Sequence, residues 1–191
     1  MKLVFATHNL NKFKEVQSLL PPTIQLLSLT DIDCHDDIPE TADTIEGNAL
    51  LKVAYVKEKY GLDCFADDTG LEVTSLNNAP GVYSARYAGV GATDQSNIEK
   101  LLDKMSKIQD RKARFKTVIA LTYKGKKLLF EGICQGLILP QPRGGKGFGY
   151  DPVFLPDGKN QTFAEMTLQE KSSVGHRGKA IQQLITYLEQ V

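Results

Sequence analysis

Residues 65–71 constrain this chain most, because an apolar run leads directly into two adjacent carboxylates, a hydroxyl and a glycine. If the apolar run ends a buried strand, the side chains of Asp67 and Asp68 point to opposite faces of a sheet. Gly70 would then let the chain turn away from the strand. Two acids at the end of a buried strand suit a hard divalent cation such as Mg²⁺, which prefers oxygen ligands. The alternative is a polar corner between strand and turn that binds no ligand.

The composition limits the classes of function. The 191 residues include 23 basic and 23 acidic side chains, so nothing in the bulk charge attracts nucleic acid or an anionic membrane, and any anion site must be local. The length suits one domain or two tightly joined lobes. The cysteines are dispersed and form no C-x-x-C pair, which is typical of reduced thiols in the cytoplasm. Because we find neither a membrane span nor a signal peptide, we expect one cytoplasmic domain over residues 1–191.

Hydrophobic periodicity predicts the helices and strands. Apolar runs predict strands near residues 3–6, 24–29 and 71–76, and two β-branched runs predict a long antiparallel hairpin over residues 114–139. Helical spacing predicts helices at about residues 11–20, 45–60 and 94–108 and at the C-terminus. Capping patterns predict helix starts at Asp43 with Glu46, and at Thr162 with Glu165.

Residues 7–12 form a polar turn between the first predicted strand and the first predicted helix, called the 7–12 turn below. Asn9 or Asn11 is the expected N-cap, so free backbone N–H groups at the helix start would offer an anion site. Lys12 adds a point charge beside them. The turn is not a Walker A loop, which needs more glycines. The alternative is an ordinary capped helix with surface lysines.

Residues 143–152 are rich in glycine, which allows a backbone to approach a ligand closely. The segment fits neither G-x-G-x-x-G nor the Walker A pattern. Phe148 and Tyr150 could offer ring faces to a nucleotide base.

Cationic side chains occur at two further places where a ligand is one explanation. His176 and Arg177 lie near the N-terminus of the last predicted helix, where the helix dipole does not favour cations. A bound ligand and a solvated helix start are both compatible with that position. Arg86 stands between two tyrosines and could hold a phosphate or carboxylate, or stack on a ring.

Taken in order, these segments resemble the inosine triphosphate pyrophosphatase family, which hydrolyses deaminated purine nucleoside triphosphates. The resemblance covers nearly the whole chain, and the order of motifs is specific although each motif alone is weak. The motifs that carry it are residues 7–12, Glu40 with Asn48, and residues 66–71, 80–87, 147–152 and 171–178.

The resemblance implies an α/β fold with a long mixed β-sheet, flanking helices and two lobes around a central nucleotide cleft. It also implies that the protein forms a homodimer and that it binds a small-molecule nucleotide as its substrate. Asp68 would accept the proton and bind Mg²⁺, with Glu40 as the second carboxylate on the metal. The residues expected to contact substrate are Thr7, His8, Asn9, Leu10, Asn11, Lys12, Thr69, Phe148, Gly149, Tyr150, Asp151, Lys171, His176 and Arg177.

The chain departs from the family pattern at two positions. His8 stands where a glycine is frequent and places a side chain beside the expected phosphates, and Thr69 stands where a serine is frequent. One rival function is a septum-inhibitor-type pyrophosphatase that acts on other modified nucleotides. Another is a purine-nucleotide sensor without catalysis, against which the carboxylates of Asp68 and Glu40 argue, since a pure binder needs no group that activates water.

Overall fold

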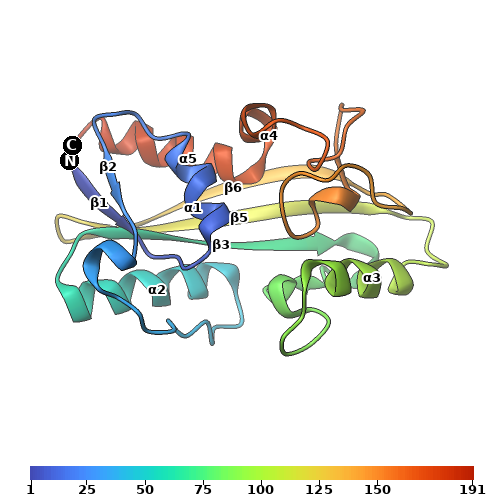
Figure 1. Cartoon of the computed structure of the whole chain (residues 1–191), viewed down its shortest axis with the longest axis horizontal. Coiled ribbons are helices and arrows are strands. Elements are labelled where there is room, and N and C mark those ends of the chain that lie inside the picture. The colour runs from blue at the N-terminus through green and yellow to red at the C-terminus, as the bar shows by residue number, and fades with distance from the viewer. The chain divides into compact units, whose positions relative to one another are not determined.

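A mixed sheet of seven strands runs through the chain in the computed structural model, which describes residues 1–191 (Figure 1). The strand order is β2-β1-β3-β5-β6-β7, and β4 pairs with β3. β1 is parallel to β2 and β3, whereas β4 and β7 pair antiparallel with β3 and β6. The α/β fold with a long mixed sheet and flanking helices is therefore confirmed.

The elements follow the periodicity of the sequence closely. The strands are β1 (Lys2–Phe5), β2 (Gln25–Leu27), β3 (Cys64–Val73), β4 (Pro80–Gly81), β5 (Lys112–Tyr123), β6 (Lys126–Ile138) and β7 (Phe154–Pro156). The α-helices are α1 (Leu10–Gln17), α2 (Ile45–Tyr60), α3 (Asp94–Lys104), α4 (Leu168–Val174) and α5 (His176–Leu188). Gly61 ends α2 with a φ of 69°, a conformation that suits glycine.

The chain divides into two units. Unit 1 comprises Met1–Asp68, Thr117–Gly132 and Arg177–Val191, and unit 2 comprises Thr69–Lys116 and Ile133–His176. β3, β5 and β6 each contribute residues to both units.

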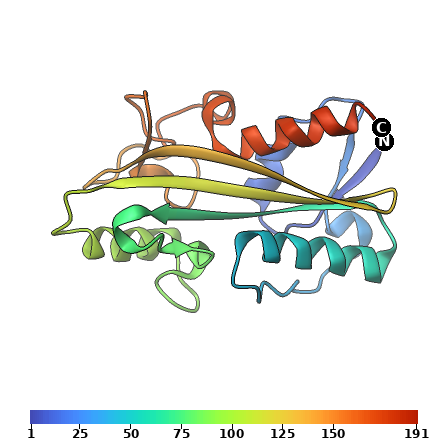
Figure 2. The ribbon, with the colours of Figure 1, turned by 180° about the vertical axis from the view of Figure 1, so that it is seen from behind.

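Unit 1 packs helices on both faces of its strands, as Figures 1 and 2 show from opposite sides. On β1 and β3 the side chains alternate, because successive residues of a strand point to opposite faces. Leu3, Phe5 and Phe65 pack in a cluster with residues of α1 and α5. The alternate residues of the same strands face α2. Val4, Ala6, Cys64 and Ala66 form a second cluster with Ala49, Val53 and Val56 of that helix.

Unit 2 has a core of its own around the ends of the long strands. Ile98 and Leu101 of α3 and its C-cap residue Met105 are buried there, as their helical spacing predicts. Three phenylalanines, Phe115, Phe154 and Phe163, form mutual ring contacts in this core, the shortest with centroids 4.7 Å apart.

The main difference from the sequence prediction concerns β3. Asp67, Asp68 and Gly70 were expected at a corner where the strand ends, but β3 continues through them to Val73. The corner prediction is wrong because both acids have buried cationic partners, so neither needs the solvent exposure of a turn.

Two predicted helix starts are also displaced. The N-cap of α2 is Thr44, whose Oγ1 accepts from the N–H of Gly47, and Asp43 lies one residue outside. Thr162 and Glu165 close a turn, in which the N–H of Thr162 donates to the Glu165 carboxylate. The capping box of α4 is formed instead by Thr167 and Glu170.

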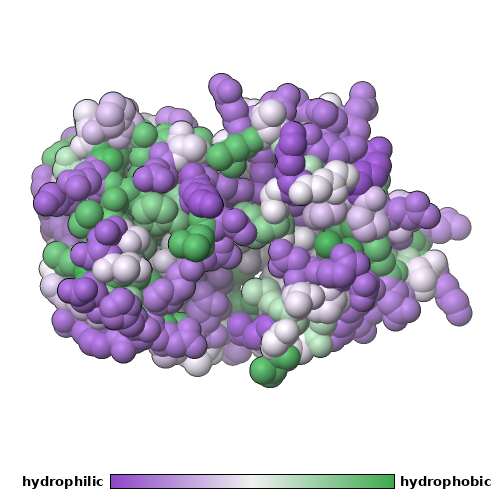
Figure 3. Space-filling model, in the orientation of Figure 1, coloured by the Kyte–Doolittle hydropathy of each residue, from purple (hydrophilic) through white to green (hydrophobic).

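Hydrophilic side chains cover most of the face drawn in Figure 3, with apolar side chains scattered among them. Scattered exposed apolar groups are normal for a globular protein surface. None of the helices combines the length and the hydropathy that a membrane crossing requires.

Candidate active site

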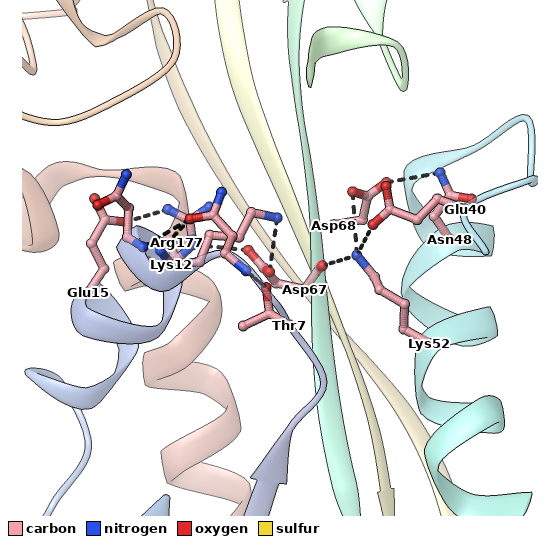
Figure 4. A network of polar contacts seen from close by, with 11 residues as sticks. Thr7, Lys12, Glu15, Glu40, Asn48, Lys52, Asp67, Asp68 and Arg177 are labelled. Atoms are coloured by element: carbon pink, nitrogen blue, oxygen red, sulfur yellow. Dashed lines mark hydrogen bonds and ion pairs between the residues drawn. The ribbon is translucent and has the colours of Figure 1, made fainter. Parts of the chain in front are cut away.

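Asp67 and Asp68 lie in the middle of β3 and point to opposite faces of unit 1 (Figure 4). The alternation of the strand explains this directly, since Asp67 continues the face of Phe65 and Asp68 continues the face of Ala66. Asp67 therefore meets side chains from α1 and α5, whereas Asp68 meets side chains from α2 and the loop before it. The prediction that the two carboxylates face opposite ways is confirmed.

The Asp67 carboxylate is fully buried between two cations. Lys12 Nζ lies 3.0 Å from its Oδ1, and Arg177 Nε donates to its Oδ2 at 3.0 Å. Arg177 Nη1 also pairs with Glu15 of α1. Burial opposes ionisation of Asp67, but the attraction of Lys12, Arg177 and Lys52 outweighs it and lowers the pKa of Asp67 well below its usual range. The surroundings of Asp67 thus favour its charged form, in which it anchors two cations.

The Asp68 carboxylate has a different setting on the other face. The side-chain amide of Asn48 donates to its Oδ2 at 3.3 Å, and Lys52 Nζ lies 3.7 Å from its Oδ1. Burial raises the pKa of Asp68, and repulsion from Glu40 and Asp67 adds to that rise, more than the lysines lower it. A carboxylate whose pKa is raised in this way holds a proton more readily, which suits a general base.

Lys52 connects the groups on this face. Its Nζ donates to Glu40 Oε1 and to the main-chain oxygen of Asp67, each at 2.6 Å. Burial lowers the pKa of Lys52, but attraction to Asp68, Glu40 and Asp67 outweighs it, so the net shift is upward and the ammonium stays charged. Glu40, Lys52, Asp67 and Asp68 are called the β3 cluster below.

The donor set on the Asp68 face fits a magnesium ion that also binds substrate phosphate. No group of three or more histidine, cysteine, aspartate or glutamate side chains could hold a metal by itself. Glu40 and Asp68 both interact with the ammonium of Lys52, so their carboxylates converge on one positive charge. Mg²⁺ commonly uses one or two carboxylates together with water and substrate phosphates, and these two would serve that role.

In the 7–12 turn the predicted N-cap is confirmed, but the backbone N–H groups expected to bind an anion have other acceptors. Asn9 caps α1, and its Oδ1 accepts from the N–H groups of Asn11 at 3.0 Å and Lys12 at 3.1 Å. The N–H of Asn9 donates to Thr7 Oγ1 at 3.2 Å. The prediction of free backbone donors is therefore wrong for these three residues, because side chains within the turn already accept from them. Lys12 lies half-buried, so the alternative of a surface lysine is also wrong here.

In unit 2, Asp151 organises the glycine-rich segment. Its Oδ2 accepts from the N–H of Phe148 at 2.9 Å and from Lys171 Nζ at 2.6 Å. Lys171 Nζ lies 4.8 Å from the centroid of the Phe148 ring and 5.6 Å from that of Phe163. Gly147 has a φ of 75°, and a Cβ on it would fall on the Asp151 carboxylate, so only glycine fits there. Phe148, Asp151 and Lys171 are called the aromatic lysine site below.

The other predicted contacts in unit 2 have varied surroundings. Tyr150 is buried in the core and donates its hydroxyl to the main-chain oxygen of Ser84, so Phe148, which is half-buried, is the ring better placed to meet a base. The N–H of Gly149 donates to Asp94 Oδ2 at 2.7 Å. Thr69 lies half-buried on β3.

His176 and Arg177 are 3% and 4% exposed, so the alternative of a solvated helix start is wrong for both. The ring of His176 stacks on Phe115 with centroids 4.6 Å apart. The pairing of Arg177 with Asp67 and Glu15 gives a structural reason for a cation at the start of α5. Arg86 Cζ lies 5.3 Å from the centroid of the Tyr83 ring, so stacking on a tyrosine, one of the two alternatives predicted for Arg86, is confirmed.

Sequence reasoning missed Lys52, Glu15 and Phe163. Lys52 had a detectable signal, because Asn48 and Lys52 are one turn apart within the apolar stripe of α2, where polar residues need buried partners. Glu15 gave no such signal, since its partner Arg177 is far away in the sequence. Phe163 gave none either, since nothing in the local pattern indicated that its ring would lie beside the Lys171 ammonium.

The fold and the β3 cluster define a class of protein: an α/β protein in which two carboxylates on a central strand meet lysines from the flanking helices. Such groups suit a metal-assisted reaction of a phosphate compound.

Comparisons with known proteins place the chain more closely. The model of the Ham1 family matches residues 3–187, and the chain belongs to that family. It is 63% identical, over 98% of its length and 99% of the relative's, to a dITP/XTP pyrophosphatase of Christiangramia forsetii. A relative of the same name from Flavobacterium johnsoniae is 57% identical over 98% of both chains. The resemblance found in the sequence is confirmed.

Solved structures agree with this assignment. A HAM1 protein from Coxiella burnetii is 40% identical and superposes with a TM-score of 0.92, covering 100% of both chains. A protein from Mycobacterium abscessus, described as a nucleoside-triphosphatase and dITP/XTP pyrophosphatase, is 41% identical with a TM-score of 0.78, covering 97% of this chain and 99% of that one.

Proposed function

We propose that this chain hydrolyses deaminated purine nucleoside triphosphates, namely ITP, dITP and XTP, to the nucleoside monophosphate and pyrophosphate, with Mg²⁺ as cofactor. The substrate class follows the names of its full-length relatives. The observation that carries the chemistry is the opposite shift of pKa in two adjacent carboxylates, because it separates an anchor, Asp67, from a candidate base, Asp68.

In the proposed reaction each side chain has a role that follows from its surroundings. Asp68 orients a water molecule and accepts its proton as the water attacks phosphorus. Asn48 and Lys52 hold the Asp68 carboxylate in place. Lys52 and Lys12 supply positive charge for the phosphates, and Asp67 fixes Lys12. Mg²⁺, bound through Glu40 and Asp68, would neutralise charge that develops on the phosphates.

The test is an assay of pyrophosphate release with ITP, dITP, XTP, ATP, GTP and modified pyrimidine triphosphates, with and without Mg²⁺. We expect release from the deaminated purine nucleotides and dependence on Mg²⁺. A preference for modified pyrimidines would favour the septum-inhibitor-type alternative. Nucleotide binding without any product would indicate a sensor and refute the proposal.

The bond that breaks is expected to be the one that joins the α-phosphorus to the bridging oxygen. Water then adds to the α-phosphorus, its proton passes to Asp68, and pyrophosphate leaves as a unit. In ¹⁸O-labelled water the label should therefore appear in the monophosphate. Label in pyrophosphate, or release of orthophosphate with a diphosphate product, would refute this course of reaction.

Base selection is proposed to depend on hydrogen-bond donors that accept the 6-oxo group of a deaminated purine and oppose the 6-amino group of adenine. Arg177 and His176 are the candidate donors. Replacing Arg177 by alanine should lower the ratio of ITP turnover to ATP turnover. The ratio is the right measure, because Arg177 also pairs with Asp67 and Glu15, and damage to that network should lower both activities equally.

We further propose a cytoplasmic homodimer. Cys34, Cys64 and Cys134 are buried and form no disulfide, which suits a reducing compartment, and the proposed substrates belong to the nucleotide pool. Light scattering coupled to size-exclusion chromatography tests the dimer, and fractionation of cells tests the location.

A further inference from the structure

His8 is exposed, and it stands in the 7–12 turn where the family pattern often has glycine. Its Nε2 lies 2.8 Å from the main-chain oxygen of Asp36. Because a carbonyl oxygen can only accept, Nε2 must carry the hydrogen and donate it. The neutral ring with its proton on Nε2 and the doubly protonated ring can both make this bond, so it does not depend on the charge of His8.

Asp36 is fixed from its other side by α2. Its carboxylate accepts from the hydroxyl of Tyr55 at 2.7 Å and pairs with the ammonium of Lys59. These bonds from Lys59 and Tyr55 lower the pKa of Asp36. The main chain of Asp36 is therefore held by His8 while its side chain is held by the helix.

The segment that begins at Asp36 carries Glu40, one of the two proposed metal ligands. At its far end the N–H of Ala42 donates to Asn48 Oδ1 at 2.9 Å. Residues 36–42 thus run between two hydrogen-bonded ends, one bonded to His8 and the other to Asn48, and Glu40 lies between them. Asn48 in turn donates to Asp68, so both ends of the segment are tied to parts of the candidate active site.

We propose that His8 is a positioning residue, whose bond to Asp36 ties the 7–12 turn to residues 36–42 and keeps Glu40 beside Lys52 and Asp68. This inference rests on the proposed function as far as Glu40 and Mg²⁺ are concerned. It differs from the expectation that His8 contacts the phosphates, because the ring acts through Asp36 and not on the substrate.

The test compares His8→Ala with His8→Gln. The glutamine amide offers an N–H at a reach similar to that of Nε2 but carries no charge, so it separates the hydrogen bond from a charge effect. His35→Ala is the matched control, because His35 is an exposed histidine next to Asp36 in the chain. Two quantities are measured: the Mg²⁺ concentration for half-maximal hydrolysis of ITP, and the hydrogen exchange of amides in residues 36–42 without nucleotide.

Losing one hydrogen bond of this kind should change each quantity by about two- to tenfold. We expect His8→Ala to raise both the half-saturating Mg²⁺ concentration and the exchange rates, His8→Gln to restore both, and His35→Ala to leave both unchanged. Unchanged exchange in His8→Ala would overturn the proposal. A rise in KM for ITP that His8→Gln does not restore would also overturn it, since His8 would then act on the phosphates by charge.

Failure of the proposed function gives a different result. If the unaltered protein releases no pyrophosphate from ITP, the proposed function is wrong, and the exchange measurement alone decides whether His8 holds residues 36–42.

Discussion

Each unit of this protein contains a buried lysine beside an aspartate, and the two pairs differ in their surroundings. In the β3 cluster of unit 1, Lys52 meets the carboxylates of Glu40 and Asp68 and the main-chain oxygen of Asp67. In the aromatic lysine site of unit 2, Lys171 pairs with Asp151 and lies over the rings of Phe148 and Phe163.

This difference shows that the neighbours of a lysine–aspartate pair determine which kind of ligand the pair suits. The β3 cluster concentrates charged oxygen atoms around an ammonium, which suits phosphates and a metal. The aromatic lysine site combines a cation with ring faces, which suits a planar nucleotide base. In the first site Asp68 has a raised pKa and can take a proton, whereas in the second Asp151 also accepts from a main-chain N–H and fixes a loop.

The largest effect is expected from Asp68→Asn, which removes the proposed base and keeps the shape. Turnover of ITP should fall by about 10²–10⁴-fold. Thermal stability should change little, because the raised pKa of Asp68 means that folding does not favour its charge. Steady-state kinetics and a thermal melt measure the two quantities. Near-normal turnover would show that Asp68 is not the base.

Asp67→Asn should show the opposite balance of effects, with stability as the main loss. It leaves Lys12 and Arg177 facing a neutral amide in a buried site, which costs about 3–5 kcal/mol of unfolding free energy. Urea unfolding measures the cost. If Asp67→Asn and Asp68→Asn lose equal stability, the distinction between anchor and base is wrong.

The pH dependence of stability provides a second check on Asp67. Because folding lowers the pKa of Asp67, its stabilisation is complete above the ordinary value of 3.8 and is lost as the pH falls through the folded-state value. The unaltered protein should therefore lose stability on acidification below pH 3.8 more steeply than Asp67→Asn does.

Matched substitutions of Lys52 and Lys171 test the proposed difference between the β3 cluster and the aromatic lysine site. Lys52→Met removes the charge shared by Glu40 and Asp68, so kcat should fall by about 10²-fold. Lys171→Met removes a cation from the aromatic lysine site, so KM for ITP should rise about tenfold with a smaller change in kcat. Steady-state kinetics with ITP separate the two parameters. The same parameter changing in both variants would refute the division of roles.

The smallest effect is expected from Lys12→Ala, paired with Lys14→Ala as a control on the same helix. Lys12 lies beside Asp67 and is half-buried, whereas Lys14 is exposed. Lys12→Ala should lower kcat/KM by about tenfold through the loss of one charge-assisted hydrogen bond to phosphate, and Lys14→Ala should change it little. Equal losses would indicate only a general effect of surface charge.

The sequence predicted the features that depend on neighbours along the chain. The Asn9 cap, the end of α2 at Gly61 and the hairpin of β5 and β6 all follow from local patterns. The continuation of β3 through Asp67 and Asp68 was missed, because acids within a short stretch indicate a turn unless their partners are known. Those partners are distant in sequence: Arg177 lies 110 residues after Asp67.

The same limit applies to the site. The strand pattern and the family motif were enough to propose Asp68 as the base, whereas the role proposed for Lys52 depends on three oxygen-bearing groups that only folding brings to it. The place of Lys52 within the apolar stripe of α2 indicated burial, but the sequence alone did not identify the groups that Lys52 would meet.

Because β3 continues without interruption through Asp67 and Asp68, the number of residues in the strand matters to the site as much as the identity of the side chains. Deleting a single residue just before Asp67 would send each of the two acids to the opposite face and move it by about 3.3 Å along the strand. Asp67 and the proposed base Asp68 would then exchange faces, and neither would meet its partners. Natural variants of this enzyme should therefore accept substitutions around these acids more readily than any insertion or deletion in β3.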